Sequence, residues 1–235
     1  MRLVEIAPGH HAHASGALWI PEPRTVVIAD AHLGYGWALR RRGQLGPVVD
    51  EVARDKVRAA IDELQPATIV FLGDVVHAPR PDPREHELVE STLRALAQHA
   101  KVVIVLGNHD RGFARDFPHI GIELVPQWTT DGLIGLHGDK PAGVSASKFL
   151  VGHLHPALSV RDDAGASQRI PVFLIGASAY VLPAFSPFAA GFAVNVRLPA
   201  DVRQVLGQGE INVIAATGKR VVKLGPLAAL RRHAE

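Results

Sequence analysis

The order of its apolar segments constrains the fold of this chain more than any other feature of the sequence. Short runs rich in Val, Ile and Leu occur at residues 25–29, 68–72 and 101–106, and each has the length and composition of a buried strand. Between these runs, segments 48–65 and 84–99 repeat apolar residues at helical spacing. Strands that alternate with helices in this way predict an α/β protein whose sheet is covered by helices.

Beyond Gly132 the helical periodicity gives way to short apolar runs that are separated by glycine and proline. Such runs are typical of strands joined by turns, so the C-terminal half is predicted to form a second, mainly β layer. No repeat or long linker marks a boundary, and 235 residues suffice for a large core, so we expect a single domain over residues 1–235. The predicted strands of this half are 133–136, 149–152, 171–175, 192–196, 211–215 and 220–224.

The composition restricts the kinds of site that the chain can hold. There is no cysteine, so disulfides and thiolate metal sites are excluded, and a metal would have to be bound by His, Asp, Glu or Asn. Histidine is frequent, with 13 residues, and is the commonest metal ligand. No apolar stretch reaches the roughly 20 residues that cross a bilayer, so we expect a soluble cytoplasmic protein. The formal net charge of +2 does not by itself predict a nucleic-acid binder.

Polar side chains that can bind metals follow three of the predicted strands directly. Asp30 and His32 follow the first strand, Asp74 follows the second, and Asn108 and His109 follow the third. A glycine precedes both Asp74 and Asn108, where it permits a tight turn. Because open α/β sheets place their sites at such strand ends, we expect these side chains to converge on one centre.

Two further histidine motifs occur in the C-terminal half. His137 follows the apolar run 133–136, while His153 and His155 lie in the sequence GHLH after the run 149–152. Imidazole and carboxylate without thiolate suit Mn, Fe or Zn better than Ca or Cu(I). We therefore predict a centre of two divalent metals, and ions about 3.5–4 Å apart can clamp a phosphoryl group and lower the pKa of a bridging water.

Taken in order, these segments resemble the signature of the calcineurin-like metallophosphoesterase superfamily. Its pattern is Asp-x-His, Gly-Asp-x-x-(Asp/His), Gly-Asn-His-(Asp/Glu), a single His and Gly-His-x-His, and the match spans Asp30 to His155. The resemblance implies a four-layer α/β/β/α sandwich of two mixed sheets. It also implies hydrolysis of a phosphoester with two divalent metal ions, Mn being favoured over Fe or Zn.

The same resemblance implies a role for each residue of the motifs. His109 would be the general acid that protonates the leaving oxygen, and Asp110 would orient it by a hydrogen bond. His77, which ends the second motif, can face the substrate or support the site, although a purely structural role explains it equally well. One metal would be held by Asp30, His32, Asp74 and His155, and the other by Asp74, Asn108, His137 and His153.

The second motif also indicates a branch of the superfamily. It reads GDVVH and ends in His77 instead of the Asp that is common in phosphoprotein phosphatases, which resembles the nuclease subunits of double-strand-break repair complexes. A closer resemblance is to the DNA-ligase-associated phosphoesterases known as PdeM, carried by residues 17–43, by GNHDR and GHLHP, and by LPAFSPFAAGF at 182–192. This implies DNA or RNA as the substrate, and DNA repair beside a DNA ligase or helicase.

Several residues near the motifs are candidates for substrate binding. Arg111 lies beside the third motif and can contact a phosphate. A run of three arginines follows the first motif and can meet nucleic-acid phosphates, although a solvated helix face explains it equally well. Tyr35 and Trp37 can stack a base or simply pack at the rim. The run comprises Arg40, Arg41 and Arg42; the early histidines His10, His11 and His13 are expected in a solvated turn.

Three functions stay open from the sequence alone. The first is a phosphodiesterase or nuclease acting on nucleic acid. The second is a small-molecule phosphatase, cyclic-nucleotide phosphodiesterase or pyrophosphohydrolase with the same metals. The third is a non-catalytic metal-binding scaffold of the kind found in the retromer, and the complete ligand set argues against it. The oligomeric state is open, with a homodimer as one alternative.

Overall fold

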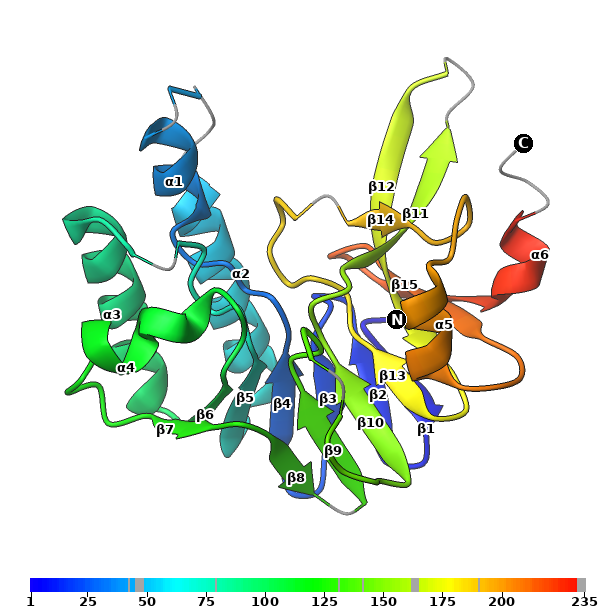
Figure 1. The fold of residues 1–235 in the computed structure, drawn as a ribbon, viewed down its shortest axis with the longest axis horizontal. Coiled ribbons are helices and arrows are strands. Elements are labelled where there is room, and N and C mark those ends of the chain that lie inside the picture. Colours follow the sequence, from blue (N-terminus) through cyan, green and yellow to red (C-terminus); the bar gives the residue numbers. More distant parts are fainter. Residues whose placement is uncertain are drawn as a thin grey trace.

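The computed structural model describes residues 1–41, 43–44, 49–78, 80–130, 132–140, 142–161, 165–189 and 191–231. Two β-sheets pack face to face, with helices on the outer face of each (Figure 1). This arrangement confirms the predicted α/β/β/α sandwich of two mixed sheets.

The first sheet contains the three central strands that the sequence predicts. Its strand order follows the chain from β1 to β7; the pairs from β1 to β4 are antiparallel and those from β4 to β7 are parallel. Since β4, β5 and β6 run in the same direction, their carboxyl ends meet at one edge. The strands are Leu3–Ala7 (β1), His10–His13 (β2), Leu18–Ile20 (β3), Thr25–Ile28 (β4), Thr68–Leu72 (β5), Lys101–Val105 (β6) and Glu123–Val125 (β7).

The second sheet is formed by the C-terminal half, as predicted. Its order is β14-β11-β12-β13-β10-β9-β8, with β15 and β16 joined through β12. β9 and β10 are parallel, so their carboxyl ends also share an edge. The strands are Trp128–Thr130 (β8), Leu133–Leu136 (β9), Lys148–Val151 (β10), Pro156–Arg161 (β11), Ser167–Ile175 (β12), Ala179–Val181 (β13), Phe192–Ala193 (β14), Asn212–Ala216 (β15) and Val221–Pro226 (β16).

Helices cover the outer faces of the two sheets. Figure 1 shows α2 and α3 beside the first sheet and α5 and α6 beside the second. None of the described helices is both long and apolar enough to span a membrane. The α-helices are Tyr35–Arg41 (α1), Val49–Leu64 (α2), Pro83–Ala97 (α3), Phe113–Asp116 (α4), Ala200–Leu206 (α5) and Leu227–Arg231 (α6), and a short 3₁₀ helix, η1, spans Asp110–Gly112.

Three apolar cores hold the four layers together. In the first, Val57 of α2 and Leu93 of α3 pack on Phe71 of the first sheet. The second lies between the sheets, and the third joins the second sheet to α5 and α6. Alternate residues of β5 face opposite sides, so Phe71 enters the first core and Leu72 the second. This alternation explains why the central strands read as continuous apolar runs.

The first strands differ from the sequence prediction. His10, His11 and His13 form strand β2 instead of a solvated turn. The side chain of His13 is fully buried; its Nε2 lies 3.2 Å from Glu63 Oε2, and its Nδ1 lies 2.8 Å from the hydroxyl of Ser15. Pairing with β1 and β3 satisfies the backbone of this segment, so it needs no apolar run of its own.

Glu85 joins helix α3 to helix α1. Asp82 caps α3, accepting hydrogen bonds from the amides of Arg84 and Glu85, and the Glu85 side chain accepts in return from the Asp82 amide. The guanidinium of Arg41 in α1 lies 3.3 Å from Glu85 Oε2. Burial of the Glu85 carboxyl raises its pKa to about 7, although the charge of Arg41 acts to lower this pKa.

The raised pKa of Glu85 should make stability depend on pH. The folded protein binds this proton more tightly than the unfolded chain, in which the pKa is near its ordinary value of 4.5. The stabilisation is therefore complete below about pH 4.5 and is lost as the pH rises through about 7. Relative to the wild type, we expect Glu85→Gln to gain about 1 kcal/mol in free energy of unfolding between pH 5 and pH 8.

Urea denaturation at the two pH values measures this difference. The matched control is Glu87→Gln, on the exposed side of the same helix. Its free energy of unfolding should differ from that of the wild type by the same amount at both pH values. A Glu85→Gln variant that differs from the wild type by the same amount at pH 5 and pH 8 would contradict the prediction.

Candidate metal centre

The predicted metal ligands lie on strained loops at the strand ends. Five of the seven have a backbone φ in the left-handed region, at 54° for Asp30, 44° for His32, 48° for Asp74, 59° for His153 and 41° for His155. Side-chain-bearing residues rarely adopt this conformation, although Asp and His tolerate it better than most. Strain of this kind concentrates at functional sites, where the surrounding structure enforces it.

Two glycines let these loops approach one another. A Cβ atom on Gly73 would collide with the ring of His137, and one on Gly107 would collide with the side chain and amide of Asp74. Gly73 also has a φ of 76°, as expected for a tight turn, whereas Gly107 does not have a positive φ. At Gly107 the requirement is therefore close approach, and the turn that the sequence predicted is not the reason for the glycine.

The first group of candidate ligands comprises Asp30, His32 and His155. One donor atom from each lies within 4.8 Å of the others. Asp30 is fully buried, and its Oδ2 accepts a hydrogen bond of 2.8 Å from the amide of His153. Its Oδ1 lies 3.1 Å from His155 Nε2. Despite this short distance, neither atom of the pair has a hydrogen-bond partner among the described residues, and neither has His32 Nδ1. Buried donor atoms that converge without a partner fit a bound cation.

The second group comprises Asp74, His137 and His153, whose donor atoms also lie within 4.8 Å of one another. His137 Nε2 lies 3.4 Å from Asp74 Oδ1, 3.1 Å from Asn108 Oδ1 and 3.2 Å from His153 Nδ1. The other ring nitrogen, Nδ1, lies 2.9 Å from the carbonyl oxygen of Leu72. A backbone carbonyl in this position fixes the orientation of metal-binding histidines, and it leaves Nε2 to face the ligands.

Charge couples the two groups. Burial acts to lower the pKa of His137, but its hydrogen bond with Asp74 and the charges of Asp30 and Asp74 outweigh burial and raise it to about 9. Burial acts to raise the pKa of Asp74, and the contacts with His137 and His109 outweigh this and lower it to about 2. Burial lowers the pKa of His32 to about 4, so this ring is neutral at neutral pH, as a ligand must be. A cation bound at His137 would have to displace the proton that its raised pKa retains, and the carboxylate and imidazole donors suit divalent cations of the Mn, Fe or Zn type.

His109 lies beside Asp74, at the rim of the second group. Its amide donates a hydrogen bond of 2.9 Å to Asp74 Oδ1, and its ring Nε2 is 3.9 Å from Asp74 Oδ2. The ring Nδ1 contacts the carbonyl oxygen of His77. This contact fixes the ring and leaves Nε2 on the side of the ligands.

Asp110 makes different contacts from those predicted. Its Oδ1 accepts hydrogen bonds from the amides of Val75 and Val76, at 3.0 and 3.2 Å, and its Oδ2 accepts from the amide of Gly107 at 3.0 Å. The carboxylate therefore joins the loops after β5 and β6, and the His77 carbonyl contacts the His109 ring in its place. Burial raises the pKa of Asp110 to about 6.

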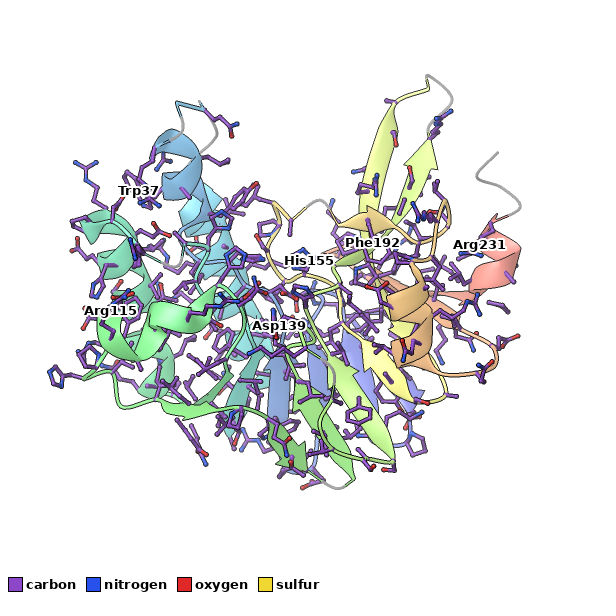
Figure 2. The ribbon with its side chains drawn as sticks, viewed as in Figure 1. Trp37, Arg115, Asp139, His155, Phe192 and Arg231 are labelled. Atoms are coloured by element: carbon purple, nitrogen blue, oxygen red, sulfur yellow. The ribbon has the colours of Figure 1, made fainter. Side chains whose placement is uncertain are left out.

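Two of the predicted arginines are engaged within the protein. Arg41 pairs with Glu85 and Asp82, and the guanidinium of Arg40 lies over the ring of Trp37 at 4.4 Å. Figure 2 shows Trp37 on α1, away from His155 in the middle of the molecule. Arg111 is exposed on η1. Arg42 lies outside the described residues.

A contact that sequence reasoning missed supports the loop of Asp30. Lys56 of α2 donates a hydrogen bond of 2.6 Å to the carbonyl of Phe185, and burial lowers the pKa of its ammonium to about 8. The amides of Phe185 and Ser186 donate to the carbonyls of Ala29 and Asp30, at 2.8 and 3.0 Å. No sequence signal marks Lys56, because a partly buried lysine in an amphipathic helix resembles a solvated one.

The α/β/β/α sandwich gathers carboxylate and imidazole side chains at the carboxyl ends of strands from both sheets, which defines a candidate metal-binding protein. The sequence matches the calcineurin-like phosphoesterase family over residues 23–163, so the chain belongs to this family and is a metal-dependent phosphoesterase. Both the superfamily and the enzyme class are as predicted from the sequence.

The chain is also similar to solved structures. The nuclease MPE of Pseudomonas putida is 25% identical, with a TM-score of 0.70, over 94% of this chain and 98% of that one. A predicted phosphoesterase of Streptococcus pneumoniae TIGR4 is 15% identical over 86% of this chain and 96% of that one, with a TM-score of 0.31. Vps29 of Entamoeba histolytica, solved with Zn²⁺, is 14% identical over 86% of this chain and 98% of that one, with a TM-score of 0.34. No curated protein matches the sequence.

The contacts of Asp74 with His137 and His109 lead to a test of metal binding. Replacing its carboxylate with an amide removes the charge that faces His137 and His109, so we expect Asp74→Asn to bind Mn²⁺ at least about tenfold more weakly. Titration calorimetry and metal analysis after gel filtration measure this loss. Asp62→Asn, at an exposed position of α2, should bind as the wild type does. Equal binding by the two variants would contradict the prediction.

Proposed function

We propose that this phosphoesterase cleaves phosphodiester bonds in nucleic acid with the help of two divalent metal ions. The observation that carries the proposal is the position of His109, whose ring is fixed by the His77 carbonyl beside the candidate ligand Asp74. Similarity to a nuclease over nearly the whole of both chains supports nucleic acid as the substrate class.

The proposed ligand sets follow two of the three groups of converging donor atoms, and the third group, formed by His32, His77 and His109, is assigned to the side of the substrate. Asp74 contributes to both ligand sets. It faces His137, and it follows β5, the strand that pairs with the strand before Asp30. Bound at these residues, two divalent ions supply a water of lowered pKa and neutralise charge on the phosphoryl group. We propose Asp30, His32, Asp74 and His155 for one ion, and Asp74, Asn108, His137 and His153 for the other, with Mn as the metal.

The proposed roles of the remaining residues follow from their contacts. His109 donates a proton from Nε2 to the leaving oxygen, since its Nδ1 is held by the backbone. His77 supplies that carbonyl, and its ring lies beside those of His32 and His109. Asp110 acts as a positioning residue, because it holds the loops that carry Asp74 and His109. Arg111 is the arginine proposed to contact a substrate phosphate.

A small-molecule phosphoesterase is the second candidate function. The observation that favours it is the engagement of Arg40 and Arg41 within the protein, by Trp37 and by Glu85 and Asp82, which removes two proposed contacts to a nucleic-acid backbone. The first proposal also places the protein in the cytoplasm and gives it a role in DNA repair, beside a DNA ligase or helicase. This part of the proposal rests on sequence resemblance.

Turnover of several substrates by the Mn²⁺-loaded protein separates the candidates. The panel comprises bis-p-nitrophenyl phosphate, p-nitrophenyl phosphate, cyclic nucleotides, and single- and double-stranded DNA and RNA. We expect cleavage of the diester and of nucleic acid. Activity confined to monoesters would overturn the nucleic-acid proposal and favour the second candidate. If no phosphoester is turned over while metal stays bound, both would be wrong.

The acid role of His109 gives a sharper expectation. His109→Ala should lower kcat for bis-p-nitrophenyl phosphate by about 10²- to 10⁴-fold, because the leaving oxygen would depart without a proton. Its Mn²⁺ content should stay at the wild-type level, since His109 is outside both ligand sets. His119→Ala, at an exposed position, is the matched control and should retain full activity. A loss of Mn²⁺ from His109→Ala would instead place His109 among the ligands.

A further inference from the structure

Two aromatic rings from distant parts of the chain lie parallel beside the candidate metal centre. Tyr35 is the first residue of α1, and Phe188 lies in the segment between β13 and β14. Their ring planes differ by 6°, and their centroids are 6.2 Å apart. Both residues are partly exposed. The pair therefore offers aromatic surface to a ligand from two separate segments.

The backbone ties both rings to the candidate ligands. The amide of Tyr35 donates a hydrogen bond to the carbonyl of His32 at 3.2 Å. The amide of Ser186 donates to the carbonyl of Asp30 at 3.0 Å, and the Ser186 hydroxyl accepts from the amide of Phe188 at 3.4 Å. The aromatic pair is thus fixed in position relative to the centre.

Ring contacts connect the pair to the proposed acid. The ring of Tyr35 meets that of His77 edge to face, with centroids 4.3 Å apart at 87°. The His77 ring in turn lies 5.6 Å from the His109 ring and 5.4 Å from the His32 ring. The His77 ring therefore lies between the aromatic pair and the side chains that would meet a scissile phosphate. The base of the adjoining nucleotide can span this separation.

The neighbouring Trp37 differs from this pair. Its ring is covered by the guanidiniums of Arg40, at 4.4 Å, and Arg84, at 5.3 Å. Within the described part of the chain, the cations over aromatic rings lie on Trp37, Phe185 and Tyr180, and none lies on Tyr35 or Phe188. Of the two aromatic residues of α1, Tyr35 is therefore the one whose ring carries no cation among the described residues.

We propose that Tyr35 and Phe188 form a stacking site for the nucleobase next to the scissile phosphate. The inference rests on the proposed action on nucleic acid and deepens it, since it makes the base part of what is recognised. Flat aromatic surfaces bind every base through its π face, so this site would favour nucleotides over sugar phosphates without reading sequence.

Binding of two phosphomonoesters by the Mn²⁺-loaded protein tests the proposal without requiring DNA cleavage. The probes are dAMP and 2-deoxyribose 5-phosphate, which differ in the base, and titration calorimetry gives both Kd values. We expect the wild type to bind dAMP on the order of tenfold more tightly. Tyr35→Leu and Phe188→Leu should each reduce this preference, and Tyr35→Phe should keep it, since the ring is retained. Trp37→Leu is the matched control and should keep it as well.

The outcomes distinguish this inference from the function on which it rests. Equal Kd values for the two probes in the wild type would overturn it, and so would a full preference for dAMP in both Leu variants. DNA cleavage without any preference for dAMP would overturn the stacking site alone. A preference for dAMP that is lost in the Leu variants, in a protein that cleaves no nucleic acid, would support the stacking site and overturn the nuclease proposal. Thermal melting of each variant checks that the Leu variants fold.

Discussion

The crowding of buried carboxylates and imidazoles at the strand ends is the constraint on which the rest of the structure depends. Asp30 and Asp74 are almost completely buried, and each is surrounded by ring nitrogens that face it and one another. Backbone amides of His153 and His109 stabilise one oxygen of each carboxylate. The remaining donor atoms require positive charge, which a proton on His137 supplies in part and which bound cations would supply in full.

The two-sheet architecture makes this crowding possible. The loops after β4, β5 and β6 come from one sheet and those after β9 and β10 from the other, so ligands approach the centre from both sides. An apolar core between the sheets holds these strand ends at a fixed separation. The cooperative packing of the preceding strands offsets the conformational free energy that the left-handed residues of these loops cost. Rigid strands beneath strained loops therefore give a preorganised site.

The sequence predicted those features that depend on local pattern. β4, β5 and β6 were predictable because buried parallel strands are continuous apolar runs, and the candidate ligands because each follows such a run. Strand β2 was not predictable, because the HHAH segment is held as a strand by its pairing with β1 and β3. The partner of His13 is Glu63, which lies 50 positions later in the sequence. The contacts of Asp110 were predicted wrongly because backbone amides compete with side chains for its carboxylate. The pattern of side chains in a sequence does not show where such amides will lie. The pairing of Tyr35 with Phe188 likewise exists only in three dimensions.

The contact between Lys56 and Phe185 bears on the order in which the centre is completed. All of the candidate ligands lie within the stretch that matches the family, which ends at residue 163, whereas the segment that clasps the backbone of Asp30 follows it. On a ribosome, every ligand would have emerged before Phe185 and Ser186 could reach the loop of Asp30. Completion of the site would therefore depend on a part of the chain that carries none of its ligands.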